Sequence, residues 1–281
     1  MICVGLAAQA EPHLRLTTNL IWQREEPWFG GFSGIEIGAG GTQVTLLTDR
    51  RTLITGHMVR REGQLTGMRV QDVLPIRHAN HKIVRNVFAD SEGLAIGADG
   101  IAYVSFENAT RVAQISTKTG VTKRLPDYPA FGRMKANKGL EALAIHPNGA
   151  LYTMPERTPA HRKTIPLYAF DGKQWHLAHQ IPRAGPFMSV GADFDDKGRF
   201  YLLERALTPL GFRSRIRRFD LNAPRLGEIT LLTTKPGFLD NMEALTVWKS
   251  PEGDTRLTLI ADDNFRAIQR TQIVELSLIH I

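Results

Sequence analysis

Glutamate residues recur at one position of a repeated sequence unit, and their side chains are the ones in this chain best suited to chemistry. The units EGLAIGADGIAYVSFEN, EALAIHPNGALYTMPER and EALTVW begin with Glu92, Glu141 and Glu243. Carboxylates that converge can hold a hard cation such as Ca²⁺, and a cation held there would polarise an ester and activate a water. We therefore predict that these three glutamates are catalytic residues and ligands of a divalent cation, with calcium as the first candidate.

Each unit has the pattern of a β-hairpin. In the clearest copy, residues 142–145 form a short apolar strand, Pro147-Asn148-Gly149 is a turn, and residues 151–154 form the returning strand. A second acid, Glu156, closes the unit. Because the strands of a hairpin are antiparallel, the start of the first and the end of the second lie at the same edge of the sheet. We expect both carboxylates of a unit to lie on one rim.

The unit returns about every 50 residues, a period typical of blade-type repeats. Copies begin near residues 33, 92, 141, 190 and 243, with Ser33 and Val190 at the first-acid position of two of them. One such hairpin cannot bury its own apolar face, whereas several arranged radially can. We predict an all-β fold, a single β-propeller of five or six blades. The interval 51–90 is where a sixth blade would lie.

The N-terminal strand is expected to close the ring. Residues 14–22 alternate as a strand does. The last blade shows three strand patterns, at residues 244–248, 257–261 and 272–278. The N-terminal strand would supply the fourth strand of that blade.

Acids also stand at the ends of the second strands, and polar residues follow them. The acids are Asp49, Glu107, Glu156, Glu204 and Asp262, and the residues that follow are Arg50, Asn108, Arg157, Arg205 and Asn264. Converging like charges are costly unless they are paired or bound to a metal. We predict that Glu156 and Asp262 join the metal ligands. The residues that follow the acids are predicted to neutralise them or to bind an anionic substrate.

A structural role is the alternative for the first-strand glutamates. Carboxylates that accept backbone N–H groups from the neighbouring blade would recur in every repeat for that reason alone. The sequence leaves the two roles open.

The composition and net charge of the chain indicate which kinds of binding partner to expect. The chain has 281 residues, is 42% hydrophobic and 22% charged, and carries a net charge of +7, which favours a small anionic ligand. The basic stretch at residues 213–218 has the pattern of a charged edge strand, and no nucleic-acid motif accompanies it. Beyond the N-terminus no apolar run is long enough to span a membrane. We expect a monomer that binds no nucleic acid.

The N-terminus resembles the end of a secretory signal. Residues 2–8 are apolar, and Ala8-Gln9-Ala10 fits the small-x-small rule for cleavage. The chain's one cysteine, Cys3, lies in this segment, so a chain cut after Ala10 has no thiol chemistry. We interpret residues 1–10 as a signal remnant and 11–281 as the propeller domain, and we expect a periplasmic or secreted protein.

Several motifs together resemble the phytase-like propeller family, usually labelled "esterase-like activity of phytase". They are SEGLA at 91–95, GLEAL at 139–143, NMEAL at 241–245, the GGFSG entry at 30–34 and LTLIADDNF near the end, and the resemblance extends from about Leu14 to Leu276. It implies a β-propeller and phosphoester hydrolysis with calcium.

Our functional prediction is an exported, metal-dependent hydrolase of phosphate or other esters. Two alternatives stay open. One is a non-catalytic periplasmic propeller that binds a ligand or a protein, and the other is a calcium-dependent lactonase-like enzyme.

Overall fold

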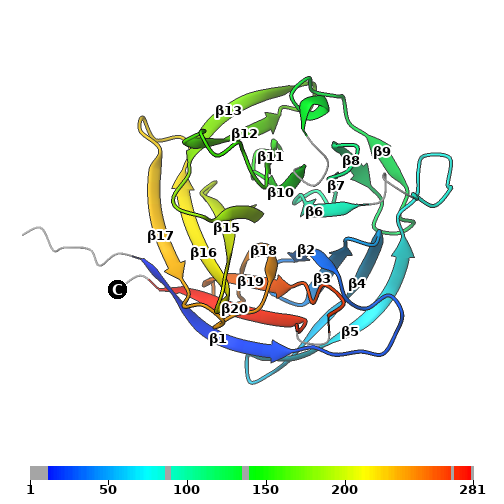
Figure 1. Cartoon of the computed structure of the whole chain (residues 1–281). Helices are drawn as coiled ribbons and strands as arrows, with labels where there is room; N and C mark the ends of the chain where they lie inside the picture. Colours follow the sequence, from blue (N-terminus) through cyan, green and yellow to red (C-terminus); the bar gives the residue numbers. More distant parts are fainter. Residues whose placement is uncertain (1–11, 86–89, 135–138, 267–268, 280–281) are drawn as a thin grey trace, which may run out of the picture.

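The protein is a five-bladed β-propeller (Figure 1). The computed structural model describes residues 12–85, 90–134, 139–266 and 269–279. The strands form five antiparallel four-stranded sheets around a central axis, and the described residues hold only one short 3-10 turn, η2 (Phe131–Arg133). The prediction of an all-β propeller is confirmed. Across the described ranges no helix has the length and apolar character needed to cross a bilayer. The predicted signal remnant lies outside the described residues.

Each blade runs outward from an innermost strand. The first four blades are β2 (Phe32–Ile37), β3 (Gln43–Thr48), β4 (Thr52–Arg61) and β5 (Gln64–Pro75); β6 (Ser91–Ile96), β7 (Ala102–Phe106), β8 (Arg111–Ile115) and β9 (Thr122–Arg124); β10 (Leu140–Ile145), β11 (Leu151–Pro155), β12 (Thr164–Phe170) and β13 (Trp175–Pro182); β14 (Met188–Phe194), β15 (Phe200–Thr208), β16 (Gly211–Asp220) and β17 (Gly227–Thr233). The fifth is β18 (Met242–Lys249), β19 (Thr255–Ala261), β20 (Gln272–Ile279) and β1 (His13–Ile21).

The two ends of the chain meet in the fifth blade. Strand β1 pairs antiparallel with β20, from His13 opposite Ile279 to Ile21 opposite Gln272. Closure by the N-terminal strand is therefore confirmed. Strand β20 also runs on past Leu276, the predicted end of the repeat, because Leu278 pairs with Leu14.

The described residues form no sixth blade. The interval that could have held one instead supplies β4 and β5, a long hairpin that pairs from Thr52 opposite Pro75 to Arg61 opposite Gln64. The extra residues lengthen the outer half of the first blade instead of adding a sheet.

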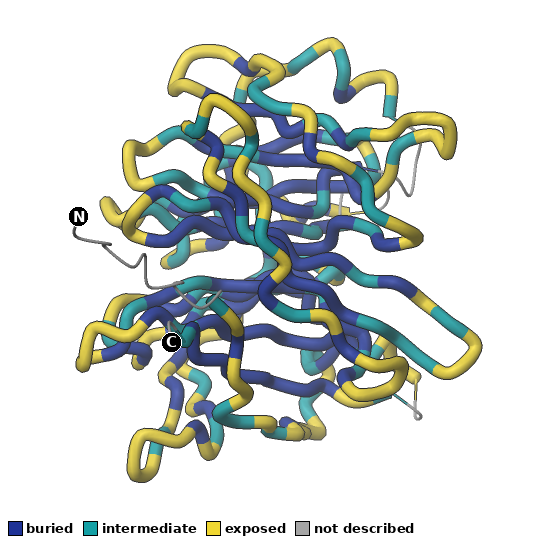
Figure 2. The backbone as a smooth tube through the Cα atoms, turned by 90° about the vertical axis from the view of Figure 1, so that its left-hand side faces the viewer, coloured by how far each residue is buried: buried dark blue, intermediate teal, exposed yellow. Residues whose placement is uncertain are grey.

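The core consists of five hydrophobic clusters, each shared by two neighbouring blades. Between the third and fourth blades, for example, Ala142 and Ala144 of β10 pack with Phe194 and Phe200. In Figure 2 the buried backbone lies in the middle of the blades and the exposed backbone in the connecting turns. Burial between blades is what a radial repeat predicts, because no blade has a core of its own.

The basic stretch at residues 213–218 does not lie on an edge strand. It belongs to β16, which pairs with β15 on one side and β17 on the other. The Arg217 side chain is fully buried and donates to Glu204 at 2.6–2.7 Å, and Arg215 donates to the same carboxylate at 2.7 Å. Arg215 and Arg217 therefore form a buried ion-pair network with Glu204. The prediction of a charged edge strand at this place was wrong.

The innermost strands pack closely around the axis. They enclose a cavity of about 10 Å³, which holds at most one water, so the channel is blocked below its mouth. Gly93 of β6 shows how tight the fit is. A Cβ atom there would lie 2.5 Å from the backbone oxygen of Glu141 in the next blade.

We predict that Gly93→Ala lowers the free energy of unfolding by about 1–3 kcal/mol, because the added methyl group must push two blades apart. Urea unfolding measures the change. Gly67→Ala is the matched control, since a Cβ at that position of β5 meets no atom within 4 Å. Equal stability of the two variants would contradict the close approach of the blades.

Candidate functional site

Each innermost strand carries a β-bulge at the same place. The pairing register shifts between the residues that flank Ser33, Glu92, Glu141, Val190 and Glu243. A bulge re-aims the residue that it leaves unpaired. These are the five positions that the sequence alignment of the copies assigned to the first acid, with Ser33 and Val190 as its exceptions. The bulges explain why the position recurs although its residue type varies.

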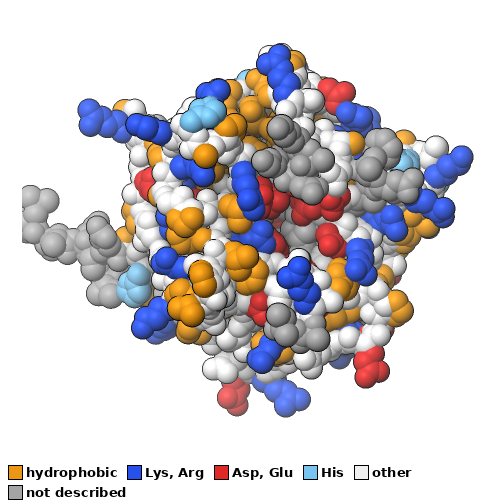
Figure 3. All heavy atoms as spheres, in the orientation of Figure 1, with side chains coloured by type: hydrophobic (Ala, Val, Ile, Leu, Met, Phe, Trp, Pro, Cys, Tyr) orange, Lys and Arg blue, Asp and Glu red, His pale blue; other side chains and the backbone are white. Residues whose placement is uncertain are grey.

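The acidic side chains gather at one mouth of the channel. Figure 3 shows them around the centre of this face, with basic side chains around them. Electrostatic interactions connect Glu141 with Glu92, Glu107, Glu156 and Glu243. The bulged glutamates therefore lie near Glu107 and Glu156, two of the acids that end second strands.

One group at this mouth has the geometry of a cation site. Oxygen atoms of Asp90, Glu92 and Glu107 all lie within 4.8 Å of one another. Around it, Asn108 donates to Asp90 Oδ2 at 2.6 Å, and the backbone N–H of Gly139 in the next blade donates to Glu107 Oε1 at 3.4 Å. Asn108, predicted to bind substrate, therefore orients a carboxylate of this group.

A divalent cation fits this group. Calcium–oxygen distances are about 2.3–2.6 Å, so two ligand oxygens of one Ca²⁺ lie at most about 5 Å apart. The separations in the group are within that limit, and the donors are all oxygen. Burial raises the pKa of Glu92 well above its ordinary value, and the carboxylates of Glu141 and Asp90 raise it further. A bound cation would relieve this repulsion.

A second group, around Arg205, is already neutralised by the protein itself. The guanidinium forms ion pairs with Glu243 and, at 3.3 Å, with Glu156, and it donates to Asn241 at 2.5 Å. Asn241 in turn donates to Glu243 Oε1 at 2.9 Å. Arg157 donates to the other oxygen of Glu156 at 2.8 Å, and its side chain remains 51% exposed. Glu156 and Glu243 therefore have cationic partners that Glu92 lacks.

Arg205 occupies a position that the sequence analysis gave to Glu204. In the third blade Leu140, the residue before the bulge, pairs with Pro155, and Glu156 comes next. In the fourth blade the equivalent Ser189 pairs with Glu204, and Arg205 comes next. Arg205 is therefore the counterpart of Glu156. The fourth blade thus places a cation where the other blades place an acid, and Glu204 turns away to the buried Arg215 and Arg217. The placement of Glu204 on the rim was wrong. Counting forward from the turn glycines, Gly149 to Glu156 and Gly198 to Arg205, gives the correct alignment.

Glu141 lies between the two groups and has no hydrogen-bond donor among the described residues. Burial raises the pKa of this carboxyl well above its ordinary value, and Glu156 and Glu243 add to the rise while Arg205 opposes it. These surroundings favour the neutral form of the carboxyl, and a cation bound nearby would favour the charged form.

Asp49 and Asp262 complete the acidic rim. Burial raises the pKa of Asp49 to about 7, with Asp262 as the next cause, and burial raises the pKa of Asp262 to about 6. Oδ1 of Asp49 is buried without a hydrogen-bond partner. The backbone N–H of Asn264 donates to Asp262 at 2.7 Å, and exposed Arg50 stacks on the ring of Phe265 at 3.2 Å. The two predicted substrate-binding residues on this side of the mouth are thus engaged within the protein.

Other acids perform the structural role that was the alternative for the bulged glutamates. Glu36 of β2 accepts the N–H of Ile96 at 3.2 Å, and Asp193 of β14 accepts the N–H of Val247 at 2.5 Å. Both bonds join neighbouring blades deeper in the channel. In the described part of the chain, Glu92 and Glu141 accept no such bond, so interblade hydrogen bonding does not account for their presence.

The sequence analysis missed Asp90. This residue lies two positions before the bulged Glu92, as Asn241 lies two positions before Glu243. A polar residue at that offset is the signal that could have identified it. Of the predicted ligands only Glu92 belongs to the group of three, and Glu141, Glu243, Glu156 and Asp262 lie outside it.

Comparison with known families agrees with this geometry. Residues 27–265 match the model of the family described as "Phytase-like: Esterase-like activity of phytase". The chain belongs to the phytase-like family. The resemblance drawn from the sequence is confirmed. No curated protein matches the sequence significantly.

The chain is also similar to several solved structures. The PQQ-bound aldose sugar dehydrogenase from Streptomyces coelicolor aligns with a TM-score of 0.54 and 11% identity, over 97% of this chain and 100% of that one. Virginiamycin B lyase from Staphylococcus aureus aligns with a TM-score of 0.44 and 13% identity, over 89% and 71% of the two chains. A chain of the nidogen/laminin complex gives 0.48 and 13%, over 82% and 75%. At these identities the likeness concerns the fold alone.

We predict that the metal-free protein is less stable at pH 8 than at pH 5. The pKa values of Asp49, Asp193 and Glu243 are raised to about 7, chiefly by burial. Between their ordinary values near 4 and about 7 the folded state binds more protons than the unfolded state, so the free energy of unfolding falls as pH rises. Each group contributes roughly 1–4 kcal/mol to this loss.

Thermal unfolding in chelator at the two pH values measures the effect. Asp193→Asn should reduce the slope, because the amide oxygen can still accept the N–H of Val247 but does not ionise. A stability that rises from pH 5 to pH 8 would contradict the burial of these acids.

Proposed function

We propose that this member of the phytase-like family is an exported, calcium-dependent hydrolase of phosphate or other esters. One observation supports it above the others. The carboxylates of Asp90, Glu92 and Glu107 form a calcium-sized group at the channel mouth, and the neighbouring carboxylate of Glu141 accepts no hydrogen bond among the described residues.

Asp90, Glu92 and Glu107 would hold the cation, with Asn108 fixing the orientation of Asp90. When bound there, calcium would polarise the ester and lower the pKa of a water. The blocked channel below the mouth limits access to one side, so substrate and water must enter from the same face.

Glu141 and Glu243 would act as the general acid and the general base of the reaction. Burial and the neighbouring acids raise the pKa of Glu141, and we assign to this carboxyl the proton that goes to the departing alkoxide as the ester bond breaks. Glu243, whose pKa is raised to about 7 by burial, can take the proton of the attacking water. Arg205 positions Glu243 through their ion pair. The half-free guanidinium of Arg157 would bind the anionic group of the substrate.

Export is part of the proposal, supported by the apolar segment before Ala10 and by the lack of cysteine after it. A chain without thiols needs no reducing compartment.

Calcium titration by calorimetry is the first test. We predict saturable binding to the wild type and at least a hundredfold weaker binding to Glu92→Gln, because the amide removes a charged ligand. Glu252→Gln, a change at an exposed turn, is the matched control and should bind as the wild type does. A wild type that does not bind calcium would refute the site.

Activity on a panel of phosphomonoesters and carboxylic esters is the second test. We predict that Glu141→Gln lowers kcat about a hundredfold or more while calcium binding is kept, because it removes a proton donor and no ligand. If the calcium-loaded wild type turned over none of these esters, the mouth would instead be a recognition site of a non-catalytic propeller. Turnover of sugar lactones alone would identify a lactonase-like enzyme.

A further inference from the structure

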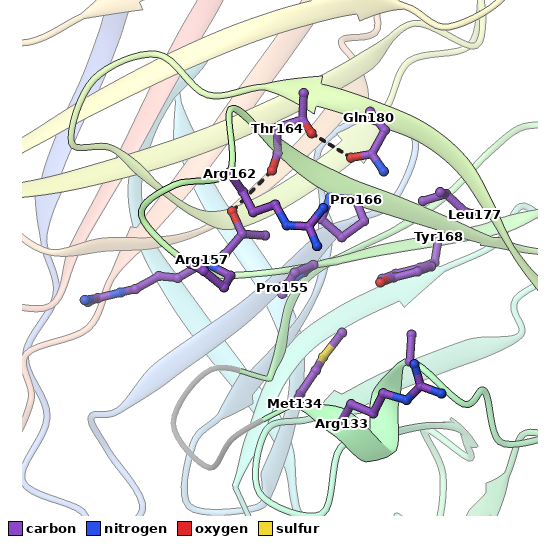
Figure 4. A pocket seen from close by; sticks show the side chains of 13 residues that line it. Arg133, Met134, Pro155, Arg157, Arg162, Thr164, Pro166, Tyr168, Leu177 and Gln180 are labelled. Atoms are coloured by element: carbon purple, nitrogen blue, oxygen red, sulfur yellow. Dashed lines mark hydrogen bonds between the residues drawn. The ribbon is translucent and has the colours of Figure 1, made fainter.

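A cavity of about 620 Å³ opens on the third blade, beside the acidic mouth (Figure 4). Its walls come from the loop after β11, from β12 and β13, and from the turn η2 of the preceding segment. A volume of this size is typical of pockets for small organic ligands and far exceeds that of inorganic phosphate. None of the acidic residues at the mouth lines this cavity, so the cavity is a separate feature.

Three arginines surround this cavity. Arg133, Arg157 and Arg162 line it, and within the described residues neither Arg133 nor Arg162 forms an ion pair. In Figure 4 the Arg162 side chain reaches over the cavity, while the Arg157 side chain extends away from it. Guanidinium groups that line a cavity are charged hydrogen-bond donors for an anionic ligand.

Neutral donors add to the arginines. The buried phenol of Tyr168 lines the cavity, and burial raises its pKa, so the hydroxyl stays protonated and can donate. Thr164 donates to the amide oxygen of Gln180 at 2.8 Å, which leaves the amide N–H groups of Gln180 free to donate.

The remaining wall is apolar and rigidly supported. Met134, Pro155, Pro166 and Leu177 contribute it. Behind them the ring of Tyr168 packs edge-on against Phe131 and Tyr128, with centroids 5.4 Å apart in both pairs. A pocket lined by arginines, apolar side chains and the ring of Tyr168 matches a ligand that has both an anionic group and an aromatic body.

We infer that this pocket binds an anionic aromatic compound, and that the substrate of the proposed hydrolase is an ester of this class. Arg157 connects the two places, because it lines the pocket and also donates to Glu156 at the mouth. The inference that the bound compound is a substrate rests on the proposed hydrolase function. The inference that the pocket binds such a compound does not depend on that function.

The test uses 1-naphthyl phosphate, with binding measured by calorimetry in chelator so that no hydrolysis occurs. We expect binding to the wild type, and binding about tenfold weaker for Arg133→Gln and for Arg162→Gln, since each loses a charge-assisted hydrogen bond. Arg225→Gln, which removes the same charge from an exposed loop of the fourth blade, is the matched control and should bind as the wild type does.

Leu177→Ser tests the apolar wall. The residue is 46% exposed, so the variant should fold, and it should weaken binding of 1-naphthyl phosphate without changing that of inorganic phosphate. Undetectable binding to the wild type, or unchanged affinity in the Arg133→Gln/Arg162→Gln double variant, would overturn the inference.

The two proposals fail separately. Loss of naphthyl phosphate binding in the double variant, with no ester hydrolysed by the wild type, would keep the pocket and discard the hydrolase. Calcium-dependent hydrolysis of methyl phosphate, with naphthyl phosphate affinity unchanged in the double variant, would keep the hydrolase and discard the pocket.

Discussion

Burial of apolar surface between neighbouring blades is the interaction on which the rest of this structure depends. Each of the five hydrophobic clusters is shared by two blades, so no sheet is stable without its neighbours. This packing brings the innermost strands so close that a Cβ atom at Gly93 would collide with the next blade. The same closeness draws the starts of those strands, and the carboxylates on their bulges, to one small mouth.

Bringing these carboxylates together at one mouth is electrostatically unfavourable. The protein compensates their negative charge on one side of the mouth more than on the other. On one side Arg205 replaces the acid of the fourth blade and forms ion pairs with Glu156 and Glu243. On the other side Asp90, Glu92 and Glu107 form no ion pair among the described residues. Burial raises the pKa of Glu107, and the nearby Arg157 opposes that rise. Buried carboxylates without such partners are common where a protein binds a metal or moves protons. The two sides of the mouth thus differ in how their carboxylates are compensated.

Local sequence patterns predicted the fold well because the two strands and the turn of each hairpin are consecutive in the sequence. The hairpin of β10 and β11 and the closing strand β1 follow from alternation and turn residues alone. The partners of the acids could not be predicted in the same way, since they come from different blades. Arg205 was read as the neighbour of Glu204 in sequence, yet it pairs with Glu156 and Glu243 across blade boundaries. The buried Arg217 was likewise read as surface charge, because its partner Glu204 lies on another strand.

The pairing of β1 with β20 also constrains how the molecule folds. Thr17 donates to the backbone oxygen of Glu275, 258 positions further along the chain, so the fifth blade cannot be completed until nearly the whole chain is present. The first four blades contain only strands that are close in sequence and can form early, whereas the last requires the closure of a very long loop. Contacts of such long range slow folding. The ring therefore remains an open arc with exposed apolar faces until its final strand arrives, and that arc is the state most exposed to aggregation.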